Sequence, residues 1–146
     1  TAPCWTGDTI EAPRFFPAWL LLRNMEHLTA EFPALLERCA HERRPENAFF
    51  ERFSVQLENL AVYFFFRYLL KASVDGALME KAGACVFHVL AISRLAASMQ
   101  IEALRELCSL CGLYSKEVEH SEENLQLLYR TIRHGALRVG TLLAMI

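Results

Sequence analysis

The sequence predicts an all-α fold, a single-domain helical bundle of about five to seven helices over residues 1–146. Three observations predict it. Apolar residues recur every three or four positions along most of the chain, which is the spacing of one face of a helix. The five prolines all lie in the first third, so no proline interrupts the later helical runs. Strictly alternating runs of β-branched residues, which are typical of strands, are missing.

The first helical run is expected to follow Pro17, because the first turn of a helix tolerates proline. Its apolar residues have helical spacing: Trp19, Leu22, Met25 and Leu28. Pro33 is expected to end or kink this run. An apolar face continues around it, up to Cys39: Phe32, Leu35 and Leu36.

The second run extends from about Glu46 to Lys71 and is apolar on nearly every face between Leu60 and Leu70. Such a pattern is typical of a helix in the middle of a bundle. The third run is expected to begin near Asp75, as an N-cap, and to end at about Ser98. Within it, the small residues of Ala82-Gly83-Ala84 would let a neighbouring helix approach closely.

The last two runs flank a polar segment. The stripe of the fourth run is Ile101, Leu104, Leu107, Cys108 and Cys111, and Gly112 is expected to end that helix. Ser121 is a good N-cap for the final helix. The apolar positions of that helix are Leu125, Leu128 and Ile132.

Composition excludes several classes of function. The net charge is −2 and the basic residues are scattered, whereas nucleic acids and anionic membranes require a basic face. The most apolar run is interrupted by Glu58, Asn59 and Arg67 and is too short to span a bilayer. We therefore expect neither a nucleic-acid nor a membrane partner.

The cysteine pattern bears on the cellular location of the protein, and the first residue bears on whether the sequence is a fragment. The five cysteines are an odd number without the spacing of small secreted scaffolds, and no signal peptide is visible. Reduced thiols in a cytoplasmic protein are the simplest interpretation. Because the chain lacks an initiator methionine, we expect it to be a fragment of a longer protein.

Two short motifs have metal-ligand spacing, and neither is complete. Cys108 and Cys111 are two residues apart, but a zinc site needs four ligands and the chain has no second pair. Glu117 and His120 form Glu-x-x-His, which di-iron bundles need twice. No other histidine has a glutamate three residues before it. We predict core cysteines and no metal site.

Arg67 is the most informative single residue, because an unpaired guanidinium is costly to bury. Asn59, Tyr63 and Arg67 form one polar stripe on an otherwise apolar helix. The segment YSKEVEHSEEN offers Glu117 and Glu119 as partners for Arg67. One interpretation is an ion pair that fixes helix register. The other is a pocket lined by Asn59, Tyr63, Arg67, Tyr114, Glu117 and His120. His88, between apolar neighbours, is expected to be a hydrogen-bonded core histidine.

Two segments together, ENLAVYFFFRYLLKA and YSKEVEHSEENLQLL, resemble the C-terminal half of the bacterial flagellin lysine N-methylase family. The resemblance implies transfer of methyl groups from S-adenosylmethionine to lysine side chains of flagellin. The family's cluster of closely spaced cysteines, nearer the N-terminus, is absent here. The resemblance therefore implies that this chain is the C-terminal part of a longer protein, and that activity belongs to the full-length parent rather than to this portion alone. The positions that carry the resemblance are Glu58, Asn59, Arg67, Tyr114, Glu117, Glu119, His120 and Asn124.

The chemistry of amine methylation suggests roles for three of these residues. The lysine must be neutral and aligned with the methyl group. A carboxylate and a phenol could orient it, so the catalytic candidates are Glu117 or Glu119 with Tyr114. Two other functions stay open. One is a non-enzymatic helical domain that senses a ligand or dimerises in a bacterial regulator, and the other is a scaffold that binds flagellin without methylating it. A homo-oligomer is compatible with each of them.

Overall fold

The computed structural model describes residues 12–40, 47–135, 137–138, 140 and 142. Within them every regular element is a helix, which confirms the all-α prediction. Seven α-helices have six or more residues, and a short α-helix (α5), a 3-10 turn (η1) and a π-helix (η2) complete the set. In chain order the elements are α1 (Ala12–Asn24), α2 (Glu31–Ala40), α3 (Asn47–Arg52), α4 (Ser54–Tyr68), η1 (Leu69–Lys71), α5 (Ala72–Asp75), α6 (Leu78–Ser98), α7 (Leu104–Tyr114), η2 (Ser115–Glu119) and α8 (Glu122–Arg133).

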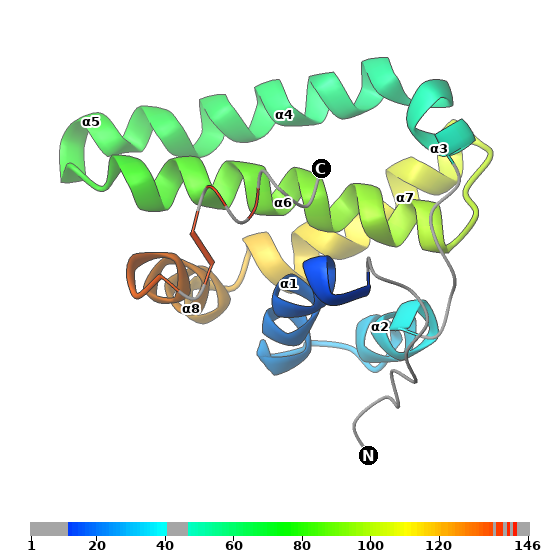
Figure 1. Ribbon diagram of the computed structural model, residues 1–146, viewed down its shortest axis with the longest axis horizontal. Helices are drawn as coiled ribbons and strands as arrows, with labels where there is room; N and C mark the ends of the chain where they lie inside the picture. Colours follow the sequence, from blue (N-terminus) through cyan, green and yellow to red (C-terminus); the bar gives the residue numbers. More distant parts are fainter. Residues whose placement is uncertain (1–11, 41–46, 136, 139, 141, 143–146) are drawn as a thin grey trace.

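Helix α6 is the central element of the fold. It packs against α4 on one side, while α1, α2, α7 and α8 contact it elsewhere (Figure 1). Its side chains are buried over most of its length, including Phe87, Leu90 and Leu95. A helix that contacts neighbours in several directions needs apolar or small residues on every face, and α6 has them.

The expectation that the run 46–71 lies in the middle of the bundle was wrong. The run is divided at Phe53 into α3 and α4, and α4 buries only one face, through Phe64 and Tyr68. The opposite face is exposed: Val62 is 48% and Phe66 62% accessible. An almost continuous apolar run shows no preferred side, so its pattern could not reveal that α4 lies at the surface.

The first two helices bury most of the predicted residues. Trp19, Leu22 and Met25 are in the core, but Leu28 is exposed because α1 already ends at Asn24. Pro33 does not end α1 and instead lies in the first turn of α2. Backbone N–H groups in the first turn have no partner within the helix, so a proline costs little there. Pro17 lies inside α1 rather than before it.

Helix α6 begins three residues later than predicted. Gly76 ends α5 with φ = 69°, the left-handed conformation that glycine adopts without strain. The Asp75 carboxylate accepts a hydrogen bond from the Ala77 N–H at 3.0 Å within this turn. Asp75 therefore stabilises the turn and is not the N-cap of α6. The end of α6 at Ser98 agrees with the prediction.

The predicted stripe of α7 was partly wrong. Leu107 is buried as expected, but Leu104 is 52% exposed and Cys108 is exposed. The buried side of α7 consists of Leu107, Leu110 and Tyr114. Gly112 does not end the helix, which continues to Tyr114 and then as η2 to Glu119.

Helix α8 matches the prediction and packs closely on α6. The Ser121 hydroxyl caps it by accepting a hydrogen bond from the Asn124 N–H at 3.2 Å. Leu125, Leu128 and Ile132 are buried. A Cβ placed on Gly83 would lie 3.1 Å from two Ile132 side-chain carbons, so the close approach expected at this glycine is confirmed.

Gly83→Val is expected to lower the free energy of unfolding by about 2 kcal/mol, because the added methyl groups would overlap Ile132. Chemical unfolding measures this change. In Ile132→Ala the space is open, so the same valine is expected to cost clearly less there. Equal costs in both backgrounds would contradict the close contact.

Candidate active site

The polar site is built on η2, which directly continues α7. Its π-helical bond runs from the His120 N–H to the Ser115 carbonyl oxygen at 3.0 Å. Short π-helical segments often occur at functional sites. Two acidic side chains of this segment, Glu117 and Glu119, are buried, and they serve different neighbours.

Glu119 is the partner of Arg67. Arg67 Nε lies 3.4 Å from Glu119 Oε1, which confirms the ion pair predicted between Arg67 and the polar segment. The same oxygen accepts hydrogen bonds from the hydroxyls of Tyr68 at 3.0 Å and Tyr63 at 3.5 Å. Glu119 therefore joins η2 to the C-terminal end of α4.

The Arg67 side chain covers this carboxylate from the solvent side. Its guanidinium carbon lies 5.8 Å from the Tyr63 ring and 5.6 Å from the Tyr68 ring. Its Nε also donates to the Tyr68 hydroxyl at 3.3 Å, and that hydrogen bond raises the pKa of Arg67. The side chain of Arg67 is 38% exposed and that of Glu119 is 3% exposed, so the pair lies at the edge of the core.

The tyrosines of this cluster act as neutral hydrogen-bond donors. Burial, followed by the charge of Glu119, raises the pKa of Tyr63 and of Tyr114 above the usual value for a phenol. Burial is also the main cause of the raised pKa of Tyr68, and Glu119 adds to it. None of these phenols would carry a negative charge near neutral pH, and Glu119 supplies the carboxyl group to which Tyr63 and Tyr68 donate.

A second, fully buried layer lies behind the cluster. His88 Nδ1 is 2.8 Å from the Tyr114 hydroxyl, and the His88 ring stacks on Phe64 with centroids 4.8 Å apart. Both His88 and Tyr114 have no exposed surface. The expectation of a hydrogen-bonded core histidine is therefore confirmed. Burial lowers the pKa of His88 to about 3, so this ring is neutral.

This buried ring predicts sensitivity to mild acid. The unfolded chain takes up a proton on His88 below its ordinary pKa of 6.5, whereas the folded chain does so only near pH 3. Stability is therefore full above pH 6.5 and falls by about 1.4 kcal/mol per pH unit below it. From pH 7 to pH 5 we expect His88 to remove about 2 kcal/mol. Urea unfolding of the wild type and His88→Gln at both pH values measures this, and an equal pH dependence in both proteins would contradict it.

Glu117 lies on the other side of η2 and holds the loop between α1 and α2. Its two carboxylate oxygens accept hydrogen bonds from the Leu28 N–H at 2.7 Å and the Thr29 hydroxyl at 2.6 Å. Asn124 supports the same loop: its amide bonds the N–H and the carbonyl oxygen of Glu26, each at 2.8 Å. Asn124 also donates to the Glu117 carbonyl oxygen at 2.8 Å.

The structure thus separates the sequence candidates into three groups. Tyr63, Arg67 and Glu119 form the cluster at the edge, with Tyr114 behind it, and Glu117 and Asn124 hold the α1–α2 loop. Glu58, Asn59 and His120 are exposed and no contact joins them to the cluster.

Sequence reasoning missed Tyr68. A signal existed, since Tyr68 is four residues after Phe64 on the same face of α4, and a buried phenol needs a partner.

The cysteines and histidines do not form a metal centre within the described residues, where no group of three potential ligands is close enough to hold an ion. Cys108 is exposed and Cys111 is partly buried, so the prediction of core cysteines was wrong for Cys108. Burial raises the pKa of Cys85 and of Cys111 to about 11. Both thiols are therefore protonated and weakly reactive at neutral pH.

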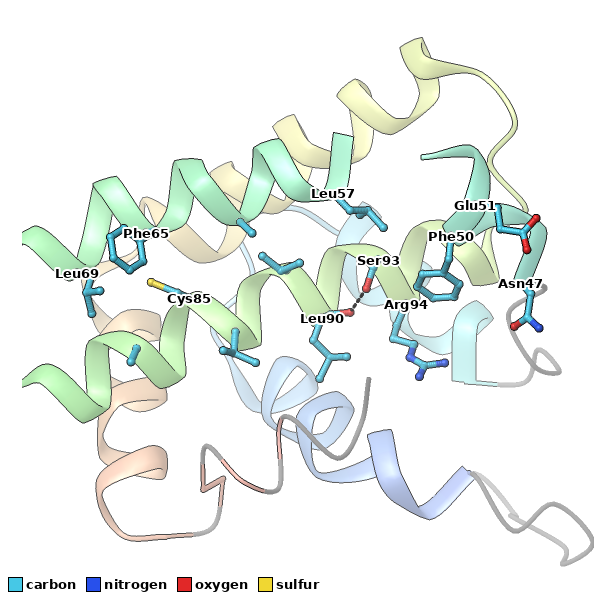
Figure 2. Close-up of a pocket in the computed structure, with 14 residues that line it drawn as sticks. Asn47, Phe50, Glu51, Leu57, Phe65, Leu69, Cys85, Leu90, Ser93 and Arg94 are labelled. Atoms are coloured by element: carbon cyan, nitrogen blue, oxygen red, sulfur yellow. Dashed lines mark hydrogen bonds between the residues drawn. The ribbon is translucent and has the colours of Figure 1, made fainter. Parts of the chain in front are cut away.

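A long groove of about 1100 Å³ lies between α4 and α6 (Figure 2). Its walls are apolar, with Leu57 and Phe65 on α4 and Leu69 on η1 facing Val86 and Val89 on α6. The polar side chains gather at the α3 end, where Asn47, Glu51 and Arg94 lie. Along the walls, the Ser93 hydroxyl and the Cys85 thiol donate to the carbonyl oxygens of Leu90 and Phe64.

Comparison with protein-family models matches residues 20–146 to the FliB lysine N-methylase C-terminal domain. The resemblance read from the two segments around Arg67 and Glu119 is thereby confirmed. No curated protein and no solved structure matches the chain. None of the described helices combines the length and the apolar character that crossing a membrane requires.

Proposed function

Because the chain belongs to the FliB lysine N-methylase C-terminal domain family, we propose that it serves in the N-methylation of lysine side chains of flagellin. In this proposal S-adenosylmethionine is the methyl donor. The family match over residues 20–146 is the observation that carries the proposal. The cluster around Glu119 supports it, because a carboxylate, a phenol and a cation meet there at the edge of the core.

The proposed role of the cluster concerns the acceptor lysine. A lysine ammonium must lose a proton before its nitrogen can attack a methyl group. Tyr63 and Arg67 are the exposed members of the cluster, so an incoming side chain meets them first. A lysine there competes with Arg67 for Glu119, whose carboxylate can accept a hydrogen bond or a proton from the amine.

Glu117 and Tyr114 are less well placed for this role. Both have no exposed surface, and both oxygens of Glu117 are engaged by the α1–α2 loop. We assign to Glu117 the positioning of η2, and to Tyr114 the support of the aromatic layer through His88. Of the three catalytic candidates, Glu119 is the one that contacts two exposed side chains, those of Tyr63 and Arg67.

The groove between α4 and α6 does not fit S-adenosylmethionine well. A nucleoside with an amino-acid head requires polar partners along most of its length, whereas the groove between α4 and α6 has polar side chains at one end only. The hydroxyl and the thiol on its walls already donate to carbonyl oxygens. We therefore assign donor binding to a part of the protein outside this groove.

Mass spectrometry of flagellin tests the proposal. The full-length protein that carries this chain is incubated with flagellin and S-adenosylmethionine bearing a deuterated methyl group. The proposal expects lysine peptides that gain labelled methyl groups. Flagellin that binds the protein but gains no label would favour the scaffold, and a protein that neither binds nor methylates flagellin would favour the regulator.

A further inference from the structure

The outer face of α4 and η1 exposes apolar side chains, with Glu58 and Asn59 between them. Five side chains on it are between 48% and 62% accessible: Val55, Val62, Phe65, Phe66 and Leu70. Single exposed apolar residues are ordinary, but several on one helix face, with two phenylalanines among them, mark an interaction surface. Among the described elements, no helix lies over the outer side of α4 (Figure 1).

We propose that this face joins two copies of the chain in a twofold, antiparallel dimer. The exposed row lies along the outer side of the helix as a ridge, and the groove between α4 and α6 runs beside that helix (Figure 2). A twofold axis requires one surface to complement itself. A ridge beside a parallel groove meets this requirement, since the ridge of each copy can enter the groove of the other.

The charges along α3 to η1 favour the antiparallel direction. Glu51 and Glu58 are exposed in the N-terminal half, and Lys71 is exposed at the C-terminal end. Antiparallel packing places the acidic half of one copy near the basic end of the other. The other charges of this stretch are engaged elsewhere: Arg52 donates to the Glu102 carbonyl oxygen, Arg67 pairs with Glu119, and Asp75 pairs with Lys81.

The apolar character of this face favours a permanent partner over a transiently bound substrate. Permanent interfaces are more apolar than transient ones, and homodimers with twofold symmetry are the commonest assemblies. The groove uses Leu57, Ala61 and Phe65, while the Glu119 cluster uses Tyr63 and Arg67. These sets occupy different flanks of α4, so the dimer leaves the cluster open to a substrate.

Sedimentation of the full-length protein tests this interface. The wild type is expected to be a dimer at micromolar concentration, and Phe66→Glu to weaken it about a hundredfold, because a buried charge at the centre of an interface is costly. Leu104→Glu, at an equally exposed apolar residue of α7, is the matched control and should stay dimeric. Circular dichroism checks that each variant is folded.

Two outcomes would overturn the proposal. A monomeric wild type would mean that another part of the protein or a different partner covers α4. A dimer that survives both Phe66→Glu and Val62→Glu would place the interface elsewhere.

Crosslinking tests the direction of packing. In a Cys108→Ser background, cysteines are placed separately at Val55 and Leu70, and a short bismaleimide is added. The antiparallel dimer is expected to crosslink when the two variants are mixed, with little product from either variant alone. Any other pattern would contradict the antiparallel arrangement.

Discussion

Glu117→Ala is expected to lower the free energy of unfolding by about 3 kcal/mol, the largest effect on stability that we predict for a single substitution. The substitution removes the acceptor of two short hydrogen bonds, from the Leu28 N–H and the Thr29 hydroxyl. It also leaves a gap where a side chain without exposed surface had been. Chemical unfolding at neutral pH measures the change.

Two comparisons make this prediction specific. Glu117→Gln keeps the shape and one carbonyl acceptor, so we expect it to lose about half as much. Glu102→Ala removes an exposed carboxylate of the same type and should change stability by less than about 0.5 kcal/mol. An alanine at position 117 as stable as the wild type would show that the α1–α2 loop does not depend on this contact.

The helices themselves could be predicted from local patterns in the sequence. The spacing of Leu125, Leu128 and Ile132, with Ser121 before them, identified α8 and its cap. The long apolar run failed as a guide to α4, because periodicity indicates a buried face only where polar residues mark the opposite one. The exposed Phe66 of α4 and the buried Phe87 of α6 look alike in sequence.

The site could be predicted in part, for a similar reason. The cost of burying a guanidinium made an acidic partner for Arg67 a sound inference, and Glu119 provides it. The target of Glu117 could not be foreseen, because it is the backbone of a loop nearly ninety residues earlier (sequence separation 89). The π-helical turn that presents both acids has no recognisable sequence pattern.

Glu119→Gln is expected to lower the rate of lysine methylation by the full-length protein about a hundredfold, a loss typical of removing one acid–base group. Glutamine keeps the shape and can still accept from the Tyr68 hydroxyl, which donates to Glu119 at 3.0 Å. It cannot take a proton from an amine. The fold should survive, since Arg67 is 38% exposed and its charge can turn toward water.

The initial rate of methyl transfer to flagellin by Glu119→Gln is the most direct test of the role of the cluster. Lys116→Gln, an exposed change on the same π-helix, is the matched control, and thermal unfolding is recorded for both variants. We predict a large loss of rate for Glu119→Gln, a near-normal rate for Lys116→Gln, and folded protein in each case. A folded Glu119→Gln variant that methylates flagellin at the wild-type rate would contradict the assignment of Glu119 to the acceptor lysine.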